Sequence, residues 1–170
     1  MVPEVVDLGA AFRILCVSRG GAFRAPLIAQ AMAVELAGMG LEGVQVTAAG
    51  LHAALRYDPE LAEALASVGA DAPDGTPREV TAELLEDAEL VLCAAAADLD
   101  RVLELTQVRA YTVQDYLGRS DGAEPALEAT CDLHPVERGG RLAALARHLV
   151  EQIGRELESD PARPGAAARD

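Results

Sequence analysis

The sequence contains no tryptophan, and aromatic residues make up only 3% of its 170 residues. Because 51% of the residues are nevertheless hydrophobic, the core has to be built mainly from alanine, leucine and valine. A chain of this length suits one domain with a sizeable core. We therefore expect a single domain over residues 1–158 and a disordered tail at residues 159–170.

Positive charge is also scarce. The chain has 14 basic and 28 acidic residues, which gives a formal net charge of −14. Binding to a nucleic-acid backbone or to an anionic membrane surface depends on lysine and arginine, so neither partner is expected. No apolar run approaches the roughly 18 residues that suggest a membrane span, and the N-terminus lacks the pattern of a signal peptide.

Cysteines are few and unpaired in the sequence. Cys16, Cys93 and Cys131 form no Cys-x-x-Cys motif and are odd in number, which fits free thiols in a reducing compartment. The histidines are scattered along the chain and form no recognisable metal-ligand cluster. We therefore predict a cytoplasmic protein that needs no metal and no other cofactor.

The remaining residues show alternating strand and helix patterns. Short apolar runs predict strands at residues 13–17, 44–47, 90–93 and 109–113. Helical spacing predicts helices that begin near Pro26, Asp58, Thr81, Asp98 and Arg141. This alternation indicates an α/β fold of three layers, with a four-stranded parallel sheet and helices on both of its faces. Ligands of such sheets bind beyond the carboxyl ends of the strands.

The stretch CVSRGGAFRAP, residues 16–26, occupies that position between the first strand and the first helix. Gly20 and Gly21 permit the positive φ values with which a tight loop points successive backbone N–H groups at an anion. The following helix adds the positive end of its dipole, and Arg24 could close the ring with its guanidinium group. The same spacing also fits an ordinary turn whose arginine faces solvent.

The stretch resembles the signature of the low-molecular-weight protein tyrosine phosphatases, in which Cys, five further residues and Arg-Ser-Pro directly follow the first strand. The resemblance extends from Arg13 to about Leu157. It includes the strand ending Val46–Gly50, the segment Arg78–Leu92, and Asp132–Pro135 followed by a terminal helix. The match in order and spacing implies the fold of that family.

The resemblance also implies roles for individual residues. The family's nucleophilic cysteine falls on Ser18, and the arginine that holds the phosphate oxygens falls on Arg24. The aspartate that protonates the leaving group falls on His134, with Asp132 as the alternative proton donor two residues earlier. The implied phosphate-binding residues are Arg19, Gly20, Gly21, Ala22, Phe23 and Arg24. Cys16 lies upstream within the strand and is interpreted as a small buried hydrophobic residue.

The sequence departs from the family pattern in the groups that support catalysis. Gly21, Ala25 and Ala48 stand where the family has an Asn and two Ser residues. The supporting His has no evident match around residues 75–77. Aromatic residues that commonly stack on phosphotyrosine are missing too, which suggests a different substrate such as a small phosphorylated metabolite.

A serine hydroxyl is far less acidic than a thiol, so Ser18 puts turnover in doubt. Either an engineered Cys-to-Ser change or natural divergence explains this residue. Three functions stay open at this point. The chain is a phosphomonoester hydrolase acting on a phosphorylated small molecule or phosphoprotein, an inactive pseudophosphatase that holds a phosphorylated ligand, phosphate or sulfate in the loop, or an interaction protein that retains only the fold.

Overall fold

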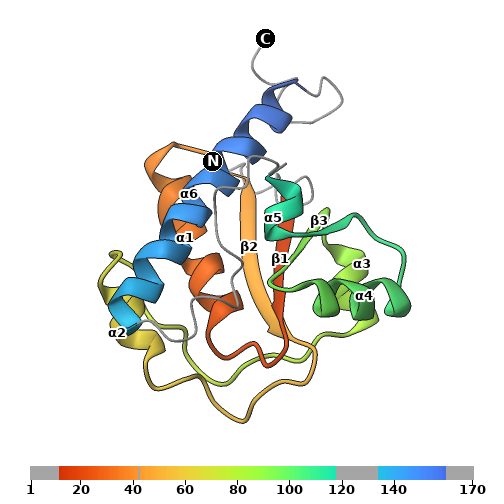
Figure 1. The fold of residues 1–170 in the computed structure, drawn as a ribbon. Helices are drawn as coiled ribbons and strands as arrows, with labels where there is room; N and C mark the ends of the chain where they lie inside the picture. Colours follow the sequence, from red (N-terminus) through yellow and green to blue (C-terminus); the bar gives the residue numbers. More distant parts are fainter. Residues whose placement is uncertain (1–11, 42, 118–133, 160–170) are drawn as a thin grey trace, which may run out of the picture.

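A computed structural model describes residues 12–41, 43–117 and 134–159 of the chain (Figure 1). The elements along the chain are β1 (Phe12–Ser18), α1 (Arg24–Gly38), β2 (Val44–Gly50), α2 (Leu61–Ala66), α3 (Ala82–Asp87), β3 (Leu90–Cys93), α4 (Ala96–Leu105), β4 (Ala110–Thr112), α5 (Val113–Tyr116) and α6 (Pro135–Ser159). Apart from Ser159, the predicted tail lies outside the described residues.

The four strands form one sheet in the order β2-β1-β3-β4, and every neighbouring pair is parallel. The predicted fold class is therefore confirmed. Because β1 lies between β2 and β3, its carboxyl end is flanked by the ends of both neighbours. The loop that follows Ser18 consequently starts at the middle of the sheet edge where ligands of such folds bind.

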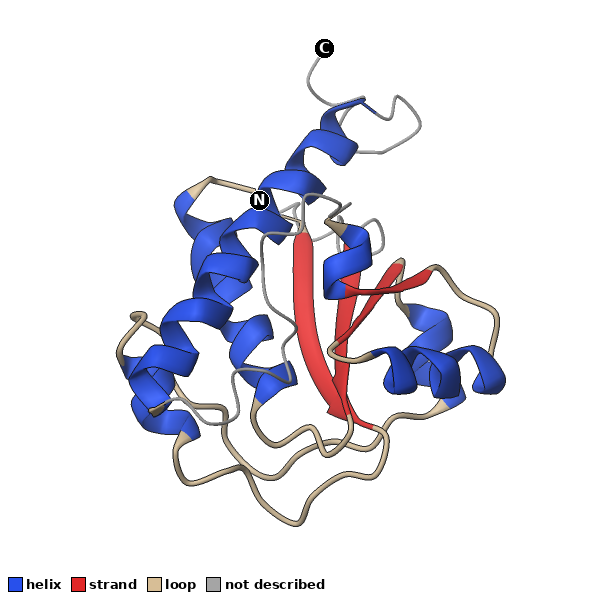
Figure 2. Cartoon of the chain, in the orientation of Figure 1, coloured by secondary structure: helices blue, strands red, loops and turns tan. Residues whose placement is uncertain are grey.

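Both faces of the central strands β1 and β3 are largely buried, as expected for parallel strands. Along β1, Ile14 and Cys16 point into one core, which α1, α2, α5 and α6 cover. Leu15 and Val17 point into the opposite core, to which α3 and α4 contribute. Figure 2 shows α1, α2 and α6 on one side of the sheet and α3 and α4 on the other.

The terminal helix α6 begins at Pro135, six residues earlier than the predicted start near Arg141. Proline is preorganised for the first helical position. Gly139 does not interrupt this helix, because it lies against α2, where an added Cβ would be only 2.8 Å from the Ala64 carbonyl oxygen. The glycine that suggests a loop in the sequence is therefore needed for the close contact of two helices.

Smaller differences occur at other element ends. Asp58 does not cap a helix directly, because α2 begins at Leu61, and Asp58 Oδ1 instead accepts the Glu60 N–H at 2.8 Å. The helix predicted to begin near Thr81 is α3, and the Thr81 side chain caps it by accepting the Leu84 N–H. In the described part of the chain, no helix is long and apolar enough to cross a membrane.

Candidate functional site

The loop between β1 and α1 is held from outside through its carbonyl groups. The Ser18, Arg19 and Gly20 carbonyl oxygens accept the N–H groups of Leu51, His52 and Ala54, at donor–acceptor distances of 3.1, 2.8 and 2.9 Å. A further bond of 3.0 Å joins the Asp58 N–H to the Ala22 carbonyl oxygen. The segment 51–58, which follows β2, therefore runs along the outside of the loop.

Outward carbonyls fix the direction of the loop amides. The structure contains no cis peptide among its described residues, and in a trans peptide the C=O and N–H bonds point in opposite directions. The N–H groups of Arg19, Gly20, Gly21 and Phe23 therefore point away from segment 51–58. The Gly21 N–H lies 3.2 Å from Ser18 Oγ, which identifies the enclosed side of the loop. We call residues 18–24 the cradle.

Two glycines allow the cradle to pack directly against the end of β2. Gly21 has a φ of +65°, a value that favours glycine, and its added Cβ would be 2.7 Å from the Gly50 nitrogen. A Cβ on Gly50 would lie 2.4 Å from the Gly20 carbonyl carbon. Both contacts are between backbone atoms, so no side-chain rotation can relieve them.

Arg24 is the first residue of α1 and is half-buried. Among the described residues its side chain forms no hydrogen bond or ion pair. The first turn of α1 also lacks an acidic residue and a side-chain cap. The positive end of the helix dipole and the guanidinium group therefore both remain available to an anion.

Ser18 itself is buried, with 2% of its surface exposed. No described thiol can replace it as a nucleophile, because burial raises the pKa of Cys16 to about 12. Burial, with the nearby charge of Asp98 adding to it, likewise raises the pKa of Cys93 to about 12. Both thiols therefore stay protonated at neutral pH. Cys131 lies outside the described residues.

The two predicted proton donors differ in what the structure says of them. Asp132 lies outside the described residues. His134 is exposed and directly precedes α6, where its Nδ1 accepts the Val136 N–H at 3.2 Å. The imidazole thus caps the start of the helix, in the manner of an N-cap side chain. A proton on Nδ1 would break this hydrogen bond, so only Nε2 is compatible with proton donation from the observed geometry.

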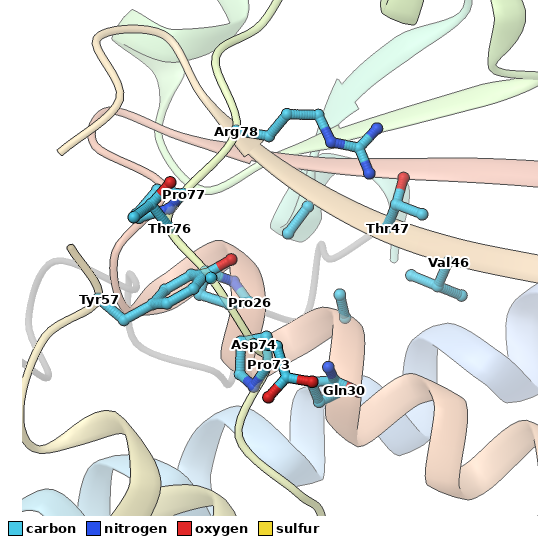
Figure 3. A pocket seen from close by; sticks show the side chains of 13 residues that line it. Pro26, Gln30, Val46, Thr47, Tyr57, Pro73, Asp74, Thr76, Pro77 and Arg78 are labelled. Atoms are coloured by element: carbon cyan, nitrogen blue, oxygen red, sulfur yellow. The ribbon is translucent and has the colours of Figure 1, made fainter. Parts of the chain in front are cut away.

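A groove with a volume of about 610 Å³ lies along the outer edge of β2. Its lining includes Ala48 and residues 75–77, the positions at which the family pattern has a supporting Ser and His. Figure 3 shows Arg78 extending toward Thr47 at one end of this groove. The groove therefore lies beside Ala48 and residues 75–77, and backbone hydrogen bonds from segment 51–58 hold the cradle.

Glu79 is a supporting residue that sequence reasoning misses. Its Oε1 accepts the Ala53 N–H at 3.2 Å, and its backbone pairs in parallel with Gly50, the last residue of β2. Glu79 thereby fixes the segment whose N–H groups hold the cradle. No local signal marks it, because an exposed glutamate in a polar loop is common. Among the described residues, no group of His, Cys, Asp and Glu side chains could hold a metal ion.

These features define an α/β protein whose central strand ends in a loop suited to a tetrahedral oxyanion. A family model described as low molecular weight phosphotyrosine protein phosphatase matches residues 13–157. The chain belongs to this family, as its sequence motifs predict. None of the curated protein sequences matches it.

Solved structures with the same fold are distant in sequence. YfkJ from Bacillus subtilis is 20% identical with a TM-score of 0.74, covering 87% of this chain and 98% of its own. The Drosophila arginine phosphatase DARP is 15% identical with a TM-score of 0.72, covering 86% and 98%. A mutant of the arginine phosphatase YwlE, with a phosphorylated serine at its active site in place of cysteine, is 22% identical with a TM-score of 0.71, covering 85% and 97%. At these identities the likeness shows the fold alone.

Proposed function

We propose that this protein binds the phosphoryl group of a phosphate ester in the cradle and, with Ser18 at the nucleophile position, does not turn the ester over efficiently. The orientation of the cradle amides carries this proposal. Successive N–H groups point to the enclosed side of the loop, and Arg24 stands unpaired beside them. Such an arrangement suits an anion with several acceptor oxygens.

Ser18 accounts for the lack of turnover. A hydroxyl group is ionised far less than a thiol at neutral pH, and the described residues place no general base against Ser18 Oγ, which accepts the Gly21 N–H.

The buried Cys16 and Cys93 thiols would be consistent with a reducing compartment such as the cytoplasm. A phosphorylated small molecule is the favoured ligand, because Val136 and Glu137 follow Pro135 where the family commonly has aromatic residues that stack on phosphotyrosine.

Phosphate binding should depend on Arg24. Calorimetric titration of the wild-type protein with inorganic phosphate should give a saturable heat of binding. Arg24→Ala should weaken the phosphate affinity about 10- to 100-fold, because a charge-assisted hydrogen-bond partner is lost. Arg13→Ala is the matched control, since Arg13 is an exposed arginine at the opposite end of β1. Equal affinity in wild type and Arg24→Ala would contradict the proposal.

A second function is favoured by the position of Ser18 Oγ inside the cradle. The YwlE mutant carries a phosphorylated serine at its active site, and Ser18 could accept a phosphoryl group in the same way. The phosphorus–oxygen bond of the donor ester would break, a bond from phosphorus to Ser18 Oγ would form, and the hydroxyl proton would leave with the departing alcohol. The product would be a stable phosphoserine.

Intact-mass spectrometry after incubation with p-nitrophenyl phosphate tests this second function. One added phosphoryl group on the wild-type protein, absent from Ser18→Ala, would support it. An unchanged wild-type mass under conditions in which phosphate binding is saturated would leave reversible binding as the function.

A further inference from the structure

Some arginines of this protein are paired with other side chains, whereas others, both at the cradle and elsewhere, form no side-chain hydrogen bond or ion pair among the described residues. The chain contains no lysine, so its 14 basic residues are all arginines, and they stand against 28 acidic residues. Arg101, Arg109 and Arg147 form ion pairs with Glu104, Glu156 and Glu35. Arg155 donates to the Gln152 side chain. These paired arginines all lie on or next to α4, β4 and α6, away from the cradle.

The arginines around the cradle have no such partners. Among the described residues, the side chains of Arg19, Arg24 and Arg56 form no hydrogen bond or ion pair. Arg19 and Arg56 are also exposed, whereas Arg24 is half-buried. In a chain with twice as many acids as bases, three unpaired guanidinium groups at one site leave positive charge uncompensated there.

Backbone contacts keep Arg56 close to the cradle. Ala54 and Asp58, two residues before and after it, both donate their N–H groups to cradle carbonyls. Two peptide links span at most about 7 Å, so the Arg56 backbone lies beside the cradle. Arg19 is the second residue of the cradle itself, and its carbonyl oxygen accepts the His52 N–H.

Nearby carboxylates are engaged elsewhere. Asp58 Oδ1 accepts the Glu60 N–H, and Glu79 Oε1 accepts the Ala53 N–H. Neither residues 18–24 nor residues 51–57 contain an acid. The arginine side chains at and beside the cradle therefore form no ion pair with the described parts of the protein.

We infer that Arg19 and Arg56 bind a second anionic group on the same ester whose phosphoryl group occupies the cradle. The inference rests on the proposed function and specifies its ligand class, which is a small phosphate ester with a further carboxylate or phosphate group. Arginine suits both groups because its planar guanidinium can donate two parallel hydrogen bonds. An aryl phosphate without a second anionic group would leave the charge of Arg19 and Arg56 unused.

Matched ligands test the inference. Calorimetry should compare 4-carboxyphenyl phosphate with 4-carbamoylphenyl phosphate, in which an uncharged amide replaces the carboxylate. The wild-type protein should bind the carboxylate about three- to tenfold more tightly, as expected for one or two exposed ion pairs. A 1,4-phenylene bisphosphate arm shows whether phosphate serves better than carboxylate as the second group. The preference should shrink as salt is raised.

The double variant Arg19→Gln/Arg56→Gln should bring the affinity ratio of the two matched esters close to one. Arg13→Gln, which removes an exposed arginine at the far end of β1, should keep the wild-type ratio. Saturable but equal binding of both esters by the wild-type protein would overturn this inference and leave the proposed function intact. A wild-type protein that binds none of the esters or inorganic phosphate would overturn both.

Discussion

Ser18→Cys is expected to make this protein a measurable phosphatase, with kcat/KM for p-nitrophenyl phosphate at least about 100-fold above that of the wild-type chain. The cradle amides and Arg24 would already be placed to bind the oxygens of the transferring phosphoryl group. Cysteine would supply the missing nucleophile. The nitrophenolate leaving group needs little protonation, so the rate in this assay does not depend on which residue donates a proton.

The new thiol should also differ chemically from the native ones. N–H groups and the start of α1 surround position 18, and such surroundings lower the pKa of a thiol. Cys16 and Cys93, with pKa values raised to about 12 by burial, should remain protonated and unreactive at pH 7. Iodoacetamide labelling followed by peptide mapping should therefore modify position 18 first in the variant.

Ser18→Cys/Arg24→Ala is the matched control, because it keeps the thiol and removes the guanidinium group. Its activity should fall to near the wild-type background. A properly folded Ser18→Cys protein with no turnover above that background, even though it binds phosphate, would show that the cradle does not stabilise the transition state. An alkyl phosphate has a poor leaving group that must be protonated as it departs. If Ser18→Cys is active, adding His134→Gln or Asp132→Asn should therefore lower its rate with an alkyl phosphate when the substituted residue is the proton donor.

Gly50→Ala should abolish measurable phosphate binding and lower the free energy of unfolding by about 2–3 kcal/mol. The added Cβ would lie 2.4 Å from the Gly20 carbonyl carbon and 2.6 Å from the Gly21 nitrogen. Because these are backbone atoms, either the cradle or the end of β2 has to move. Movement of β2 would also strain the hydrogen bonds that join Gly50 to Arg78 and Val80.

Gly20→Ala provides a control within the same loop. Its added Cβ would meet the Ala54 Cβ at 3.8 Å and the His52 carbonyl oxygen at 3.9 Å, which are ordinary contact distances. In urea unfolding and phosphate calorimetry, Gly20→Ala should therefore have a free energy of unfolding and a phosphate affinity close to those of the wild type. Gly50→Ala should lose both stability and binding. Wild-type affinity in Gly50→Ala would mean that the contact between β2 and the cradle is not needed for binding.

The fold of this protein is largely predictable from its sequence. Buried parallel strands read as short apolar runs, and the predicted strand 90–93 agrees with β3 at both ends. The predicted strand 13–17 is one residue shorter at each end than β1. The position of the cradle is predictable for the same reason, since glycines directly after a central strand and before a helix indicate a tight turn. Inward-pointing N–H groups are consistent with that reading.

Other features depend on contacts between segments that are distant in the chain. Helix α6 starts earlier than predicted and includes Gly139, which packs closely against the Ala64 backbone. A local sequence pattern cannot reveal this contact between two helices. His134 is a plausible proton donor in the sequence, but in the structure its Nδ1 caps α6. The supporting role of Glu79 is likewise visible only in the structure, where its Oε1 accepts the Ala53 N–H.

Local chemistry in the chain is thus enough to indicate the parallel α/β sheet, the phosphatase family and the loop after β1, because strand periodicity and glycine conformation are properties of neighbouring residues. Three-dimensional packing settles how that loop is held. The carbonyl oxygens of the cradle accept N–H groups of segment 51–58. Because Gly50 has no side chain, the cradle backbone can pack directly against the end of β2. Both effects arise from the close approach of segments more than 25 residues apart, for which a short stretch of sequence carries no signal.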